Sequence, residues 1–258
     1  MDALLELSDV DGAAGGKAHG LARLAALGLP VPPAIVVAPD VYARWRAGGR
    51  LDERDAGTLA AALERLEPPL AVRSSALDED TAGRSAAGQY ESVMGVRSPA
   101  ELVAAIERCF RAAASARAVA YRGADEASLA LVVQHEVPAG RAGVAFSVDP
   151  KTGDAGHVVL EVVFGHGERL VGGLADPDRF WVPRGDGPVR ARIAAKPEQP
   201  PARRFARTLR DDEAGAVARL VLRAEEGFGR PVDVEFCLDG PRVWLLQCRP
   251  VTALDGGG

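Results

Sequence analysis

Seven polar side chains stand at or near the ends of apolar, strand-like runs. They comprise two carboxylates, two carboxamides and three cationic groups: Glu161, Glu235, Gln134, Gln247, Lys17, Arg73 and Arg249. Taken one at a time, such residues are mostly solvated surface or structural ion pairs. A shared chemistry therefore has to be argued from the way the chain brings several of them together.

The last two strand-like runs, "VDVEFCLD" and "RVWLLQCR", form the most informative pair. Asp233 and Glu235 alternate with apolar residues, so they share one face of a strand. A two-residue turn at 239–240 would direct Gln247 away from Glu235. A three-residue turn that also includes Pro241 would pair Asp233 with Gln247 and place Glu235 on the diagonal. We predict the three-residue turn, because only this turn brings the polar side chains of both strands into one cluster.

This cluster has the chemistry of a magnesium and phosphate site. The oxygens of Glu235 and Gln247 suit Mg²⁺, a hard ion that takes one or two protein oxygens together with phosphate oxygens and water. Arg249 lies one pleat further along and would offer a fork of donors to the same phosphates. We therefore expect Glu235 and Gln247 to hold Mg²⁺ and Arg249 to bind phosphate.

A second candidate for phosphate binding is the loop within "LAVRSSALDEDTAGRSAAGQYES", residues 70–92. Phosphate oxygens need N–H and O–H donors at close range, and small residues such as Gly88 let the backbone itself donate. Lys17 and Arg73 would add positive charge. The alternative, a polar turn that only connects two strands, stays open from the residues alone.

Two familiar nucleotide motifs are absent. "GAAGGKAHG" has three residues between Gly12 and Gly16 and an alanine after Lys17, so it lacks the spacing of a P-loop. In "FGHGERLVGG" the third glycine of a dinucleotide fingerprint falls on Leu170, and no helical pattern follows.

Composition narrows the class of protein. The chain has 258 residues, 47% hydrophobic and 26% charged, with a net charge of −5, which argues against a nonspecific nucleic-acid binder. Its first residues lack the features of a signal peptide, and no apolar run approaches the ~18 residues of a membrane span. The three cysteines lack metal-site spacing. We expect a cytoplasmic protein with reduced thiols and no membrane partner.

The pattern of elements predicts an α+β protein. Helix-like and strand-like segments alternate up to Gly123, and most later segments are short β-branched runs typical of an antiparallel sheet. We predict one subdomain at 1–123, a second at 124–252 and a tail at 253–258. The Pro- and Arg-rich stretch 183–201 is expected to be a surface excursion.

At these residues the chain resembles a known family. "GGKAHGLARLAALGLPVPPAIVV", "AVRSSALDED", "SAAGQYESVMGV", "LVVQHEVPAGRAGVAFSVDP", "GHGERLVGG" and "DVEFCLDGPRVWLLQCRPVT" look like the ATP-binding domain of the phosphoenolpyruvate synthase, pyruvate phosphate dikinase and rifampin phosphotransferase group. The blocks occur in the family's order and cover nearly the whole chain.

The resemblance implies an ATP-grasp fold in which two subdomains close on ATP and Mg²⁺. By matching motif, the phosphates would be contacted by Lys17, Arg73 and Arg249, and the phosphate loop would be lined by Gly88, Ser92 and Val93. The adenine would be contacted by Gln134, Glu136 and Val137. Mg²⁺ would be bound by Glu235 and Gln247. Of these, Lys17, Arg73, Glu235 and Arg249 would act in catalysis.

In the family that the chain resembles, the β-phosphate of ATP passes to a histidine on a separate swivelling domain, which releases AMP, and then to a small-molecule acceptor. This chain stops soon after "RPVT", and none of its four histidines stands in a carrier-like setting. We therefore expect a phosphohistidine-bearing partner protein or domain. Two alternatives stay open: direct phosphorylation of a small acceptor, and a nucleotide-binding regulatory module without turnover.

Overall fold

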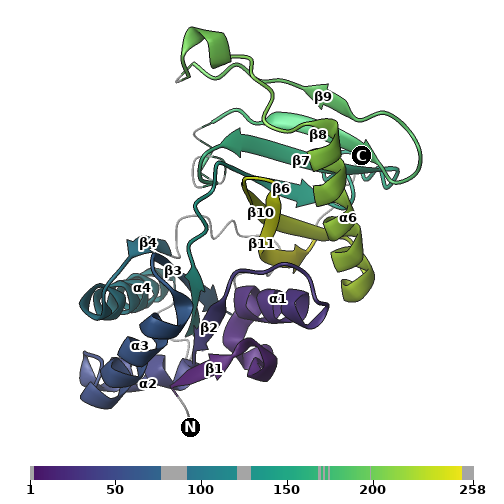
Figure 1. Ribbon diagram of the computed structural model, residues 1–258. Coiled ribbons are helices and arrows are strands. Elements are labelled where there is room, and N and C mark those ends of the chain that lie inside the picture. Colours follow the sequence, from purple (N-terminus) through teal and green to yellow (C-terminus); the bar gives the residue numbers. More distant parts are fainter. Residues whose placement is uncertain are drawn as a thin grey trace. The chain divides into compact units, whose positions relative to one another are not determined.

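The computed structural model describes residues 3–76, 92–120, 129–167, 170, 172–173, 175–197 and 199–251, without the side chains of 116–120. The chain forms two compact units. Unit 1 comprises Met1–Ala26 and Pro32–Glu136, and unit 2 comprises Leu27–Val31 and Val137–Gly258. Each unit has its own antiparallel sheet with helices packed on it (Figure 1).

Unit 1 contains a five-stranded sheet in the order β1-β2-β5-β3-β4, with every neighbouring pair antiparallel. Its strands are β1 (Leu4–Glu6), β2 (Ala34–Val37), β3 (Leu70–Ala76), β4 (Ser92–Val96) and β5 (Leu129–His135). Its helices are η1 (Leu7–Asp9), η2 (Gly12–Ala14), α1 (Gly15–Ala26), α2 (Pro39–Gly48), α3 (Glu53–Leu66) and α4 (Pro99–Ala120).

The two faces of this sheet differ in character. Val72 and Val133 are cross-strand partners and lie in the main apolar core, which also contains side chains of α2, α3 and α4. Three aromatic rings of that core, those of Tyr42, Trp45 and Phe110, have centroids 5.0–6.0 Å apart. On the opposite face α1 packs against β3 and β5. The α2–α4 layer therefore stabilises the sheet and leaves the other face to carry polar groups.

Unit 2 contains a six-stranded sheet in the order β11-β10-β6-β7-β8-β9, again antiparallel throughout. Its strands are β6 (Arg141–Phe146), β7 (His157–Phe164), β8 (Asp178–Pro183), β9 (Arg190–Arg192), β10 (Val232–Asp239) and β11 (Arg242–Pro250). The helices η3 (Pro201–Arg203) and α6 (Asp211–Phe228) come between β9 and β10.

Helix α6 runs across one face of this sheet and contacts β6, β7, β8, β10 and β11 (Figure 1). Apart from Glu213 in its first turn, its buried residues are apolar at helical spacing, among them Val217, Val221 and Phe228. Gly143 in β6 permits close packing, because a Cβ there would lie 2.3 Å from the Glu161 carbonyl oxygen and 3.0 Å from the Phe236 ring. The opposite face carries the polar residues of the hairpin.

The α+β class and the mostly antiparallel second sheet are as predicted from the sequence. The predicted division after Gly123 differs from the observed one, since β5 pairs with β2 and β3 and so belongs to unit 1. Strands β1 and β9 and helix α2 were not predicted. The predicted tail, 253–258, lies outside the described residues.

None of the described helices combines the length and apolar composition that crossing a bilayer requires.

The stretch expected as a surface excursion is anchored by a buried carboxylate. Asp178, fully buried at the start of β8, accepts hydrogen bonds from Lys196 Nζ at 2.6 Å, from Ala194 N at 2.9 Å, and from the backbone N and Oγ1 of Thr208. Lys196 is 4% exposed. The expectation of a purely surface segment is therefore wrong at Lys196, because its ammonium group is paired inside the unit.

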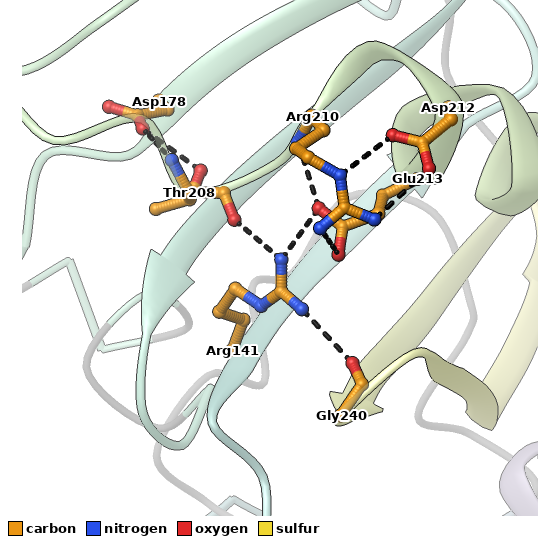
Figure 2. A network of polar contacts seen from close by, with 7 residues as sticks. All are labelled: Arg141, Asp178, Thr208, Arg210, Asp212, Glu213 and Gly240. Atoms are coloured by element: carbon orange, nitrogen blue, oxygen red, sulfur yellow. Dashed lines mark hydrogen bonds and ion pairs between the residues drawn. The ribbon is translucent and has the colours of Figure 1, made fainter.

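A second polar network holds the β10–β11 turn (Figure 2). The Arg141 guanidinium donates to the Thr208 carbonyl at 3.0 Å, to Glu213 Oε2 at 2.8 Å and to the Gly240 carbonyl at 3.0 Å. Glu213 Oε2 also accepts from Arg210 N at 2.8 Å, which caps the first turn of α6. One arginine of β6 thus ties the start of α6 to the turn of the hairpin.

Glu213 makes this network sensitive to acid. Burial alone would raise the pKa of the Glu213 carboxyl, but hydrogen bonds from Arg141 and from the Arg210 backbone outweigh burial and hold the pKa below its ordinary value. A carboxyl with a lowered folded-state pKa stabilises the fold above its unfolded pKa of about 4.3, and that contribution is lost as pH falls through the folded-state value.

We therefore expect Glu213→Gln to lower the urea midpoint at pH 7 and to have a progressively smaller effect below about pH 4. Urea unfolding of both proteins across pH 3–7, followed by circular dichroism, measures the difference. A difference that stays constant down to pH 3 would show that the ionised carboxylate contributes nothing to stability.

Candidate functional site

The register of the β10–β11 hairpin differs from the predicted one. Asp239 pairs with Arg242, so the turn has two residues, Gly240 and Pro241. The register then shifts between Glu235 and Phe236: Phe236 pairs with Leu245, whereas Glu235 pairs directly with Gln247. The predicted three-residue turn and diagonal arrangement are therefore wrong, but the expectation that the two side chains share a face is confirmed.

A β-bulge at Leu246 produces this result. Without the extra residue, the two-residue turn would place Gln247 opposite Val234, on the face that α6 covers. The bulge moves Gln247 across to the face of Glu235. Leu246 packs against a small apolar cluster of Val137, Ala142 and Cys237. Because Cys237 lies two residues from Glu235 in the same strand, this cluster adjoins the polar pair on the same face.

Arg249 is held by a carboxylate that sequence reasoning had placed on the polar face without a role. Asp233 pairs with Arg249 across the strands, and Arg249 Nε donates to both Asp233 oxygens, at 2.8 and 3.0 Å. The Asp233 side chain is 12% exposed and that of Arg249 is 50% exposed. The buried partner thus fixes the guanidinium at the surface of the face that carries Glu235.

The polar face extends across the sheet. Glu235 pairs with Val144, Val144 with Glu161, and Glu161 with Arg179, so all four side chains lie in one row. Arg179 Nη2 lies 3.2 Å from Glu161 Oε1. Sequence reasoning had singled out Glu161 but not Arg179. The position of Arg179 opposite Glu161 could be recognised only once the pairing of β7 with β8 was known.

In unit 1, three of the predicted residues share the sheet face that α1 covers in part. Arg73 pairs with Ser92 on one side and with Val132 on the other, and Gln134 lies two residues from Val132. Ser92 and Val93 open strand β4. Gly88 lies outside the described residues.

Lys17 joins this face through a close approach of two backbones. Lys17 Nζ donates to the Ser74 carbonyl at 3.1 Å, and Ala18 N donates to Ser75 Oγ at 3.0 Å. At Gly15, where φ is +81°, a Cβ would lie 2.5 Å from the Ser75 carbonyl carbon. Only glycine allows the start of α1 to lie this close to β3, which holds Lys17 of α1 against the strand that carries Arg73.

The predicted adenine-binding stretch contains an unsatisfied amide. Gln134 is 2% exposed, and its Nε2 has no hydrogen-bond partner among the described residues. The Glu136 carboxylate accepts from Gly95 N at 2.6 Å, so it supports β4. Val137 opens unit 2 and is buried in the apolar cluster beside Glu235. A buried donor without an acceptor is uncommon in folded proteins, which marks Gln134 as a candidate ligand-binding group.

The residues expected to bind metal fit Mg²⁺ by donor type. Glu235 and Gln247 supply one carboxylate and one carboxamide oxygen on a common face, and Mg²⁺ takes few protein oxygens and keeps waters. Among the described residues, no group of three His, Cys, Asp or Glu side chains is clustered as a metal site.

Comparison with known proteins identifies a matching family. The family described as "Pyruvate phosphate dikinase, AMP/ATP-binding domain" matches residues 56–257. That range contains every candidate site residue named above except Lys17 and the Gly15 contact that positions it.

Individual relatives match most of the chain. It is 34% identical to the prodigiosin synthesizing transferase PigC of Serratia marcescens, over 92% of this chain and 31% of that protein. It is 29% identical to a probable phosphoenolpyruvate synthase of Methanothermobacter thermautotrophicus, over 94% and 44%, and 32% identical to a rifampicin phosphotransferase of a Streptomyces species, over 97% and 36%. The chain thus spans less than half the length of each of these relatives.

The pairing of Asp233 with Arg249 makes a testable contribution to stability. We expect Asp233→Asn and Arg249→Gln each to destabilise unit 2, and the double variant to lose less than the sum of the two. The coupling should be about 1 kcal/mol, the upper part of the range for a pair with one exposed member. Urea unfolding of the four proteins gives this value. Strictly additive losses would mean that Asp233 does not hold the guanidinium.

Proposed function

This chain belongs to the pyruvate phosphate dikinase AMP/ATP-binding domain family, and we propose that it binds ATP with Mg²⁺ and uses it for phosphoryl transfer. The observation that carries the proposal is the pairing of Glu235 with Gln247 on the face where Asp233 holds Arg249. This is a small set of groups with the right donors for a cation and the phosphates it binds.

In this proposal Glu235 and Gln247 hold Mg²⁺, which when bound neutralises charge on the triphosphate. Arg249 donates to the phosphoryl group that moves, and Asp233 keeps its guanidinium oriented before the ligand arrives. Phosphoryl transfer needs positioning and charge stabilisation more than a covalent protein group, so preorganised donors account for most of the catalysis.

We also propose further nucleotide contacts. Lys17 and Arg73 would donate to phosphate oxygens, and Gly88, Ser92 and Val93 would line the phosphate loop. Gln134, Glu136 and Val137 would contact the adenine. The shared sheet face of Arg73, Ser92 and Gln134 supports this assignment. So does the buried Gln134 Nε2, which has no hydrogen-bond partner in the described part of the chain.

The phosphoryl acceptor is proposed to lie outside this chain. We propose that the β-phosphate passes to a histidine of a partner protein or domain, with AMP and phosphate as products, and then to a small molecule. The support is that relatives named phosphoenolpyruvate synthase and rifampicin phosphotransferase are more than twice as long as the part matched here.

The metal site is tested by Glu235→Gln, which keeps the shape of the side chain and removes its charge. We expect at least about a hundredfold loss of Mg²⁺-dependent ATP turnover with the fold intact, because the cation loses its charged ligand. A second readout is Mn²⁺ binding in the presence of ATP, followed by electron paramagnetic resonance, which should weaken in parallel.

Glu226→Gln is the matched control, since Glu226 is an exposed acid on α6, the helix that covers the opposite face of the sheet. It should leave turnover and Mn²⁺ binding unchanged. Normal activity in Glu235→Gln would refute the placement of the metal.

The route of the phosphate is tested with ATP labelled at the β or the γ position, incubated with Mg²⁺, this protein and proteins encoded near its gene. We expect acid-labile label from the β position on one of those proteins, together with AMP. ADP as the nucleotide product, with label from the γ position on a small molecule, would favour direct phosphorylation.

Gln134→Leu tests the adenine contact. Because Gln134 Nε2 has no hydrogen-bond partner among the described residues, its removal should leave the melting temperature of the ligand-free protein unchanged or slightly raised. Loss of one hydrogen bond to the base should weaken ATP binding about tenfold, measured by calorimetry. A lower melting temperature with unchanged ATP affinity would assign Gln134 a structural role.

A further inference from the structure

The polar face of unit 2 continues past the Glu161 position to the far edge of the sheet. Arg179 pairs with Arg192, and Trp181 pairs with Arg190. Cross-strand partners share a face, as do residues two apart in a strand, so all four lie on the face that carries Glu235. We call Arg179, Trp181, Arg190 and Arg192 the arginine edge.

Arg179 is buried but incompletely satisfied. Its side chain is 10% exposed, and Nη2 lies at ion-pair distance from Glu161. Neither Nε nor Nη2 makes a hydrogen bond of good geometry with any described residue. Its guanidinium carbon lies 5.5 Å from the centre of the Trp181 ring. Within the described ranges a single carboxylate therefore compensates the charge of this group, and two of its nitrogens lack acceptors there.

Arg192 stands directly opposite Arg179 on the exposed edge strand β9. Like charges in such a pair repel each other, with Cα atoms only about 5 Å apart. The Arg192 side chain makes no hydrogen bond or ion pair with the residues that the structure describes. The strand pairing thus brings together two guanidinium groups that share one carboxylate.

The other charges near this edge do not relieve the repulsion. Arg190 lies 5.8 Å from the centre of the Trp181 ring and is close enough to Asp154 to help lower the pKa of that carboxyl, after the larger effects of the Gly156 N–H and of His157. Asp154 also pairs with His157 at 2.9 Å. Glu161 and Asp154 are thus engaged with Arg179, Arg190 and His157, and neither of these two acids pairs with Arg192.

We propose that the arginine edge binds an oxyanion of the size of inorganic phosphate, held between Arg179 and Arg192. Such an anion accepts hydrogen bonds from two guanidinium forks at once and removes the repulsion between them. Trp181 supports the site because the guanidinium groups of Arg179 and Arg190 lie against its ring.

This site is separate from the proposed nucleotide site. Arg179 is three strands away from Glu235 in the sheet order β10-β6-β7-β8, a spacing of about 14 Å. The inference rests on the proposed function for its biological ligand, since orthophosphate is a product of that reaction. The arginine edge is then a second phosphate subsite on the face where phosphate is produced.

Arg192→Glu gives the decisive experiment because it replaces repulsion with attraction. A glutamate opposite Arg179 would supply the missing carboxylate, so we expect a higher melting temperature for the ligand-free protein. The same change should abolish phosphate binding, measured by calorimetry with sodium phosphate against sodium chloride at equal ionic strength. Arg192→Ala should weaken phosphate binding at least tenfold without unfolding, since Arg192 is exposed.

Arg230→Glu provides the matched control, because Arg230 is an exposed arginine of unit 2 beyond the end of α6. It makes the same change in net charge and should leave phosphate affinity within twofold of wild type. A residue with only a structural role at position 192 would not show both opposite effects, a more stable protein and lost phosphate binding.

Three results would overturn the inference: phosphate affinity in Arg192→Glu within twofold of wild type, no phosphate effect beyond that of chloride, or phosphate binding that Arg249→Gln abolishes and Arg192→Glu does not. Titration with Mg²⁺-ATP separates this outcome from the proposed function. Wild type and Arg192→Glu should bind Mg²⁺-ATP alike, and failure of wild type to bind it would count against the proposed function alone.

Discussion

The candidate site of unit 2 depends on one extra residue in strand β11. A two-residue turn sets the register of the hairpin at its closed end, and strict alternation would then direct Gln247 toward α6. A carboxamide there would enter an apolar layer, where an unsatisfied amide costs about 1–3 kcal/mol. The bulge at Leu246 adds one residue to β11, so the side chains that follow it point to the opposite face from the one that strict alternation would give them. Glu235 and Gln247 meet because of it, and Leu246 fills the apolar cluster beside them.

Unit 1 positions its polar groups by a different constraint, the distance between two backbones. The start of α1 lies against β3 at Gly15, and Ser75 fixes it there by accepting from Ala18 N and donating to the Ala14 carbonyl. This contact also fixes the position of Lys17, because Lys17 lies two residues after Gly15 in the same helix and donates to the Ser74 carbonyl. In both units the backbone conformation sets the position of a charged side chain, and a neighbouring polar group then binds it: the Ser74 carbonyl for Lys17 and Asp233 for Arg249.

Sequence reasoning could find the helices and most strands because their apolar periodicities are clear, as in α6 and β7. It found the polar face of β10 for the same reason. It could not find the bulge, since "VWLLQCR" reads as an unbroken strand and only the packing of Leu246 distinguishes the two registers. Strand β9 was missed because "RAR" has no apolar face of its own. Arg141, Asp178 and Glu213 were missed because their partners are backbone groups and residues distant in sequence.

The short segment Leu27–Val31 has a consequence for how this protein can be divided. It belongs to unit 2, where the Pro30 carbonyl accepts from Leu245 N and Leu27 packs against the Gly227 backbone, although the residues on both sides of it belong to unit 1. No single cut in the gene therefore separates two complete units. Recombination that exchanged one unit between relatives would need three crossovers, at the boundaries 26/27, 31/32 and 136/137, so the pair is expected to be inherited together.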